Sequence, residues 1–145
     1  MNGKQPMPED LITPENLSKE LLYSIFDAAY MDVSYDSDGD LMIQDDVRCF
    51  VIPNEKTKDR IRLFTLFGFN PESSELDRLE SVNRINNTYI MVRATSSNND
   101  TLFFDYDICV KGGITRKNLV LTVKRFCSIP RDAVSEYCKG IVGST

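Results

Sequence analysis

Three stretches of the chain place apolar residues at helical spacing. The first begins at Thr13-Pro14, where Thr13 can cap a helix and Pro14 suits its first turn. Its apolar residues are Leu17, Leu21, Leu22, Ile25, Phe26, Ala28 and Ala29. They cover an arc of about 180°, which is broader than the stripe that one sheet face requires. The surplus around Leu22, Phe26 and Tyr30 is a candidate contact surface, although a thick core is the favoured interpretation.

The second helical stretch runs from about residue 75 to residue 87. Its apolar face consists of Leu76, Leu79 and Val82. Asn83 and Asn86 fall on that same face, which predicts that both are buried polar residues with a structural role. Because an unpaired buried amide costs about 1–3 kcal/mol, we expect both to bond to backbone groups at a sheet end or a loop. Ligand binding is the alternative use for these two side chains.

The third helical stretch follows Lys111-Gly112-Gly113. Thr115 is the predicted N-cap, and Ile114 can pack on Leu119 as a hydrophobic staple. Leu121 lies outside the apolar arc of this helix and is expected to be exposed. Pro130 begins a last short helical stretch to about residue 139.

Alternating or apolar runs between these helices predict strands. The runs are 31–35, 41–44, 47–52, 61–67, 89–94 and 101–110. The Asp-Gly pair inside Asp36–Asp40 is a hairpin signal. Alternation puts Phe64 and Leu66 on one sheet face and Ile61, Leu63, Thr65 and Phe67 on the other, so both faces carry apolar residues.

This order predicts an α+β fold, α-β-β-β(-β)-α-β-β-α. Short links between neighbouring strands require antiparallel pairing, so we expect a single, mainly antiparallel twisted sheet of about five strands. The helices should pack mostly on one face. We assign residues 1–12 to a flexible arm, 13–140 to one domain and 141–145 to a tail.

More apolar residues are present than one layer of helices can cover. The predicted partner or dimer surface therefore combines positions on the outer sheet face with positions on the helices. Its members are Phe64, Leu66, Met91 and Phe103 on the sheet, with Leu22, Phe26 and Leu121 on helices.

Composition narrows the class of protein. The chain has 145 residues, of which 41% are hydrophobic and 27% charged, as is typical of one soluble globular domain. The longest apolar runs are far shorter than the roughly 20 residues that a membrane helix needs. The first residues contain no apolar signal core, so we expect a cytoplasmic location and no membrane partner. Four widely spaced cysteines form no C-x-x-C pair and are expected to be reduced and buried, with a metal site or redox pair as the alternative.

The chain has no histidine, which removes the commonest general base and metal ligand. The cluster Asp36-x-Asp38-Gly39-Asp40 lacks the glycine and glutamate positions of an EF-hand, so it predicts a turn. Asp105 and Asp107 are expected at a solvated strand edge rather than as an acid–base pair. We therefore predict no catalytic, metal-binding or cofactor-binding residues, and no enzyme.

Charge is unevenly distributed along the chain. Residues 1–110 contain 10 Lys/Arg and 20 Asp/Glu, whereas residues 111–145 contain 7 and 2. A basic end can indicate nucleic-acid binding. Here the basic residues alternate with core-type residues, which favours the solvated face of a terminal helix over a nucleic-acid partner.

Four features together resemble the YbjN-like family of bacterial proteins, which are described as sensory transduction regulators. They are Ile12-Thr13-Pro14-Glu15-Asn16-Leu17, Asn83-Arg84-Ile85-Asn86, Leu102-Phe103-Phe104-Asp105-Tyr106-Asp107 and Gly112-Gly113-Ile114-Thr115. Their order and spacing over residues 12 to 128 carry the match. The resemblance implies a fold similar to type III secretion chaperones, which are small, acidic, usually dimeric proteins that bind other proteins without catalysis. It supplies no catalytic or binding residues.

The expected function is therefore a non-catalytic protein-binding module, regulatory or chaperone-like, that acts as a homodimer with a protein partner. One alternative is a small-ligand binder or an enzyme that works without histidine. The other is weak binding of nucleic acid or an anionic surface through the basic C-terminal helix.

Overall fold

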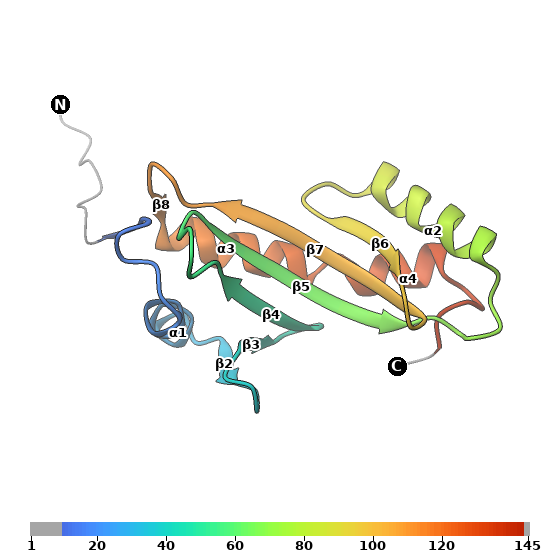
Figure 1. The fold of residues 1–145 in the computed structure, drawn as a ribbon, viewed down its shortest axis with the longest axis horizontal. Coiled ribbons are helices and arrows are strands. Elements are labelled where there is room, and N and C mark those ends of the chain that lie inside the picture. The colour runs from blue at the N-terminus through green and yellow to red at the C-terminus, as the bar shows by residue number, and fades with distance from the viewer. Residues whose placement is uncertain (1–9, 144–145) are drawn as a thin grey trace.

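The computed structural model describes residues 10–143 and has an α+β fold (Figure 1). Its helices are α1 (Lys19–Ala28), α2 (Glu75–Thr88), α3 (Arg116–Cys127) and α4 (Pro130–Tyr137). Its main sheet contains β2 (Asp32–Tyr35), β3 (Leu41–Gln44), β4 (Arg48–Pro53), β5 (Arg60–Gly68), β6 (Arg93–Ser97) and β7 (Thr101–Cys109). Two further strands, β1 (Leu11–Ile12) and β8 (Ile114–Thr115), form a small separate sheet.

The main sheet has the order β2-β3-β4-β5-β7-β6, and every neighbouring pair is antiparallel. The predicted class of fold is confirmed, with six strands in place of about five. The long central strands β5 and β7 pair over nine residues each. This pairing brings together two segments that α2 and β6 separate in sequence.

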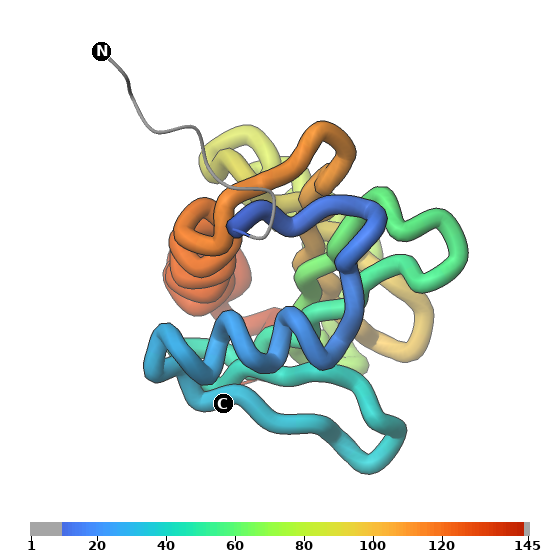
Figure 2. The backbone as a smooth tube through the Cα atoms, turned by 90° about the vertical axis from the view of Figure 1, so that its left-hand side faces the viewer, coloured from blue at the N-terminus to red at the C-terminus, as the bar shows by residue number. Residues whose placement is uncertain are grey.

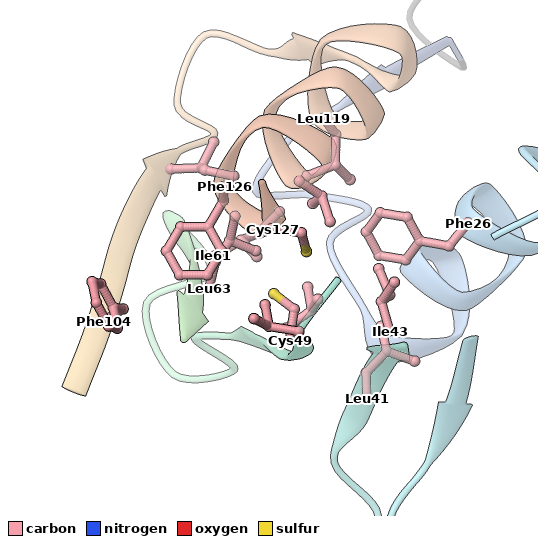
Figure 3. Packing of buried hydrophobic residues seen from close by; sticks show 14 of the residues in the cluster. Phe26, Leu41, Ile43, Cys49, Ile61, Leu63, Phe104, Leu119, Phe126 and Cys127 are labelled. Carbon is pink, nitrogen blue, oxygen red and sulfur yellow. The ribbon is translucent and has the colours of Figure 1, made fainter. Parts of the chain in front are cut away.

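The core lies between the sheet and the pair α1 and α3, which lie beside one another (Figure 2). Side chains from α1, α3 and the strands point into this interior (Figure 3). Leu22 and Phe26 belong to it and are fully buried. Their prediction as contact-surface residues is therefore wrong. The buried residues of α1 are Leu22, Ile25 and Phe26, which form one stripe facing the interior between β2 and α3.

The first helix begins later than predicted, at Lys19 with Ser18 as its cap. Residues 13–17 form a turn instead of the first helical turn. Asn16 stabilises this turn, because its Oδ1 accepts from the Thr13 N–H at 2.8 Å and its Nδ2 donates to the Leu11 carbonyl at 2.8 Å. Thr13 therefore opens this separate turn, and the cap of α1 is Ser18.

Both predicted terminal segments are partly ordered against the domain. Ile12 is fully buried and pairs with Ile114, so a flexible arm up to residue 12 is wrong for the β1 residues. At the other end, Ile141 and Val142 pack on the core, and Val142 bridges to Phe69. The remaining parts of the predicted arm and tail, residues 1–9 and 144–145, lie outside the described residues.

Helix α2 has the predicted position but a different buried face. Leu76 and Leu79 are 65% and 49% exposed, whereas Ser81 and Ile85 are buried. The Ser81 hydroxyl donates to the Tyr137 carbonyl at 2.8 Å, because α2 packs on α4 and β6. Asn83 consequently faces outward and is exposed, which contradicts its predicted burial.

Several local predictions are confirmed. Asp36–Asp40 is a tight turn in which Asp36 Oδ1 accepts from the N–H groups of Asp38 and Asp40, and Gly39 has a φ of +82°. Thr115 caps α3, and Pro130 opens α4.

The four cysteines are all reduced thiols, and three of them are buried as predicted. Cys109 is exposed. Cys49 on β4 and Cys127 at the end of α3 point toward one another in the core (Figure 3). The hydrogen bond between the two thiols, followed by burial, raises the pKa of Cys49 well above its usual value. Cys49 therefore contributes to the core as a neutral thiol.

Candidate protein-binding surface

Among residues 10–143, no helix covers one face of the main sheet. Figure 1 looks onto this outer face: α3 and α4 lie behind β5 and β7, and no helix crosses in front of them. Along β5 and β7 every second side chain, including Leu63 and Phe104, points inward to the core. The residues between them point to the outer face, which is the surface that the protein leaves open to solvent.

Three stacked aromatic rings cross the outer face. Phe50, Phe64 and Phe103 come from β4, β5 and β7, and we call them the aromatic stripe. The ring centroids of Phe50 and Phe64 are 4.8 Å apart, and those of Phe64 and Phe103 are 5.2 Å apart. All three side chains are half-buried. Leu66 lies opposite Phe103 and is 52% exposed, and we include it as the exposed end of the stripe.

A charged cluster borders the stripe. Asp105 lies directly opposite Phe64 in the sheet, yet it is only 2% exposed. Arg93 covers it with two parallel hydrogen bonds, from Nε to Oδ1 at 2.9 Å and from Nη2 to Oδ2 at 2.6 Å. Arg62 lies 3.8 Å from the same carboxylate and 3.3 Å from Asp107. The prediction of a solvated edge is therefore wrong for Asp105.

The electrostatics of this cluster are those of a closed ion-pair network. The hydrogen bonds to Asp105, and then its negative charge, raise the pKa of the Arg93 guanidinium above its usual value. Arg93 and Asp105 are also direct cross-strand partners, so the pair reinforces the contact of β6 with β7. A shallow hollow of about 290 Å³ beside it is lined by Met91, Val92, Arg93, Asp105, Tyr106 and Asp107. Its charged groups already bind one another, so the hollow offers little to an additional ion.

Apart from the buried Leu22 and Phe26, the predicted surface residues fall into three groups. Phe64, Leu66 and Phe103 come together on the outer face, as the alternation indicates. Met91 lies at the edge of the charged hollow, half-buried, with a positive φ of 60°. Leu121 is 53% exposed but lies on α3, away from the outer face.

The two predicted structural asparagines have different roles. Asn86 bonds to backbone as predicted, since its Oδ1 accepts from the Ala94 N–H at 2.8 Å and its Nδ2 donates to the Ala94 carbonyl at 3.0 Å. Ala94 belongs to β6, the edge strand, so Asn86 occupies hydrogen-bonding groups that another strand could otherwise use. The residue as a whole is exposed, so its predicted burial is wrong.

Sequence reasoning missed two members of the site. Phe50 completes the aromatic stripe, and Arg93 covers Asp105. Alternation within β4 places Phe50 opposite to Cys49 and Val51, which is the signal that could have identified it. The contact between Arg93 and Asp105 depends on the register of β6 and β7, which alternation does not reveal.

Other kinds of site find no support among the residues that the structure describes. Within residues 10–143, no group of three or more Cys, Asp or Glu side chains could hold a metal ion. In the same range, no helix has the length and apolar character to cross a membrane.

The fold and sequence place the chain among known proteins. Residues 18–137 match the model of the YbjN family, described as "Putative bacterial sensory transduction regulator". The crystal structure of YbjN from E. coli, "a putative transcription regulator", is similar with a TM-score of 0.73 and 16% identity, over 89% of this chain and 97% of that one. An uncharacterized protein from Methanothermobacter thermautotrophicus has a TM-score of 0.61 and 14% identity, over 85% and 98%. No curated protein is significantly similar. The chain therefore belongs to the YbjN family.

Proposed function

We propose that this chain is a non-catalytic module of the cytoplasm, regulatory or chaperone-like, that binds another protein through its outer face and acts as a homodimer. The observation that carries the proposal is the aromatic stripe with Leu66, which stands on a sheet face without helices. Contiguous apolar surface of this kind marks interaction sites in proteins.

The composition of the outer face supports a protein as the partner. Aromatic side chains and arginine are enriched in the centres of protein interfaces, and here the stripe lies beside Arg62 and Arg93. A flat row of rings offers area for another polypeptide rather than an enclosing cavity for a small molecule. Membership of a regulator family is consistent with such a role.

The chemistry of the site supports binding without catalysis. The chain has no histidine, and the buried carboxylate of Asp105 is held by Arg93. A general base needs a carboxylate or amine that can reach a substrate proton. The arrangement of Asp105 instead serves to hold β6 and β7 together beneath the interface.

Affinity capture from native cell lysate, with paired variants as bait, tests the proposal. Leu66→Glu introduces a charge at the most exposed apolar position of the stripe, whereas Leu66→Met keeps the position apolar. We expect one or more proteins to be recovered with wild type and with Leu66→Met, and at least about tenfold less of them with Leu66→Glu, as for an interface anchor. Equal recovery with both variants, at equal thermal stability, contradicts the proposed use of the outer face.

A further inference from the structure

A shallow apolar groove lies between α1 and the first half of α3. It has a volume of about 340 Å³ and is lined by Ile25, Ala28, Ala29, Arg116, Lys117, Val120 and Leu121. The alanines of α1 leave space between the helices, and Leu121 forms an exposed wall. We call this the α1–α3 groove.

The polar end of the groove is positively charged. Arg116 and Lys117 are the first two residues of α3, where the backbone N–H groups of the helix add partial positive charge. Lys117 is exposed, and Lys124 lies two turns further along the same exposed side of α3. An apolar groove with a basic end suits a helix that carries apolar anchors and acidic neighbours.

The chain itself contains a helix of that description. The outward face of α2 presents Leu76 and Leu79, three residues apart and thus neighbours on the helix surface. Two exposed acidic residues flank them on either side, Glu75 and Glu80. Within the residues that the structure describes, no other element packs over these leucines, because Ser81 and Ile85 face the domain.

This helix cannot reach the groove of its own chain. Helix α2 packs on β6 and α4, while α1 packs on β2 and α3. Figure 1 places α2 and α1 at opposite ends of the long axis of the molecule. A contact between the two surfaces therefore requires a second molecule.

We propose that α2 of one copy docks into the α1–α3 groove of a second copy. Leu76 and Leu79 then pack against Leu121 and the alanines, and the acidic residues of α2 face Lys117. The uneven charge of the chain favours this pairing, since α2 belongs to the acidic part and the groove cations to the basic part. The proposal specifies the self-association that is part of the proposed function and depends on it, but it uses a surface separate from the aromatic stripe.

The contact joins two different surfaces, α2 of one copy and the groove of the other. Two copies related by a twofold axis could each place α2 in the other's groove, and other geometries would give rings or open chains. This distinguishes the proposal from a dimer in which one patch contacts its own equivalent. The distinction provides a complementation experiment.

The experiment uses one variant for each surface. Leu79→Glu damages α2, and Leu121→Glu damages the groove; both positions are about half exposed, so the folded domain should tolerate the change. Sedimentation velocity over a concentration series measures self-association of each chain, with circular dichroism as the check on folding. We expect each variant alone to associate roughly 30-fold or more weakly than wild type, as for loss of an interface anchor.

Mixing the two variants gives the decisive result. The Leu121→Glu chain keeps an intact α2 and the Leu79→Glu chain keeps an intact groove, so the mixture should form a complex that neither forms alone. Two folded variants that fail to complement each other would overturn the proposal, and so would self-association that survives either change. A wild-type chain that stays monomeric overturns both this contact and the homodimer, leaving the groove to a helix of another protein or to an anionic amphiphile.

The outer-face variant separates this proposal from the function of the aromatic stripe. If Leu66→Glu keeps self-association but loses its protein partner, the two surfaces act independently, as we expect. If Leu66→Glu abolishes self-association while Leu79→Glu does not, the dimer forms through the outer face and the groove contact is wrong.

Discussion

Replacing Asn86 by alanine removes the side chain that holds α2 to the edge of the main sheet. Its amide makes two hydrogen bonds to the backbone of Ala94, at 2.8 and 3.0 Å. Each such bond contributes about 0.5–1.5 kcal/mol net, so the pair contributes about 1–3 kcal/mol. Alanine has the higher helix propensity and returns about 0.5 kcal/mol. We expect Asn86→Ala to lower the free energy of unfolding by about 0.5–2.5 kcal/mol.

Asn83 offers a matched control in the same helix. It is exposed, and its side chain makes no hydrogen bond among residues 10–143. Asn83→Ala gains the same helix propensity without losing a bond, so it should be neutral or stabilising by up to about 0.5 kcal/mol. Urea unfolding followed by circular dichroism measures both variants, and an unchanged m-value shows that the unfolded state is comparable. In thermal unfolding, Asn86→Ala should lower Tm by about 2–8 °C.

The two variants together decide whether Asn86 has this role. Equal free energies of unfolding for Asn86→Ala and Asn83→Ala would refute the reasoning, because helix propensity alone would then explain both. A larger loss for Asn83→Ala would mean that α2 presents to the domain the face that the sequence pattern predicts.

Further predictions concern the charged cluster and the thiols. Asp105→Asn should lower the free energy of unfolding by about 1.5–3 kcal/mol through loss of the charged bonds to Arg93, whereas Asp107→Asn should cost under about 0.5 kcal/mol; urea unfolding compares them. Burial raises the pKa of Cys138 from 9.0 to about 11, so the folded state holds this proton more tightly than the unfolded state. Stability from this group is complete below pH 9 and falls as the pH rises to 11, so Cys138→Ala should show a shallower loss of stability over that range. A thiol reagent should modify Cys109 alone among the four cysteines of the native protein, and rapid reaction of a second thiol would contradict the burial of the others.

The sequence predicted helix starts and turns best, because these features depend on a few neighbouring residues. Thr115 and Pro130 begin their helices as predicted, and the Asp-Gly pair forms its turn. These assignments rest on hydrogen bonds and backbone angles within a few residues, so distant parts of the chain do not change them. Strand alternation likewise sorted Phe64 and Phe103 onto the outer face.

Longer-range features were not predictable in the same way. Periodicity identifies an apolar face on α2, but it does not say whether that face meets the domain or solvent; contacts of Ser81 and Asn86 with distant segments decide this. The width of the apolar arc on α1 suggested a surplus, whereas contact with both β2 and α3 buries Leu22 and Phe26. In both helices, contacts with distant segments of the chain determine which residues are buried, and residue type alone does not.

The aromatic stripe illustrates the same limit for the site. Its stacking requires the registers of β4 with β5 and of β5 with β7, and the second pairing spans α2 and β6. Each phenylalanine is visible in the sequence as an outward residue, but their stacking follows only from the order of the strands.

Site-specific photo-crosslinking in cells that express the chain natively tests the central claim most directly. A photoreactive phenylalanine analogue at position 66 places the reactive group at the exposed end of the stripe, and the same analogue at Lys56, in the exposed turn before β5, serves as the control. We predict that light joins the position-66 chain to another protein and leaves the position-56 chain without that product. Adducts of equal yield at both positions, or none at position 66, would contradict a protein-binding outer face.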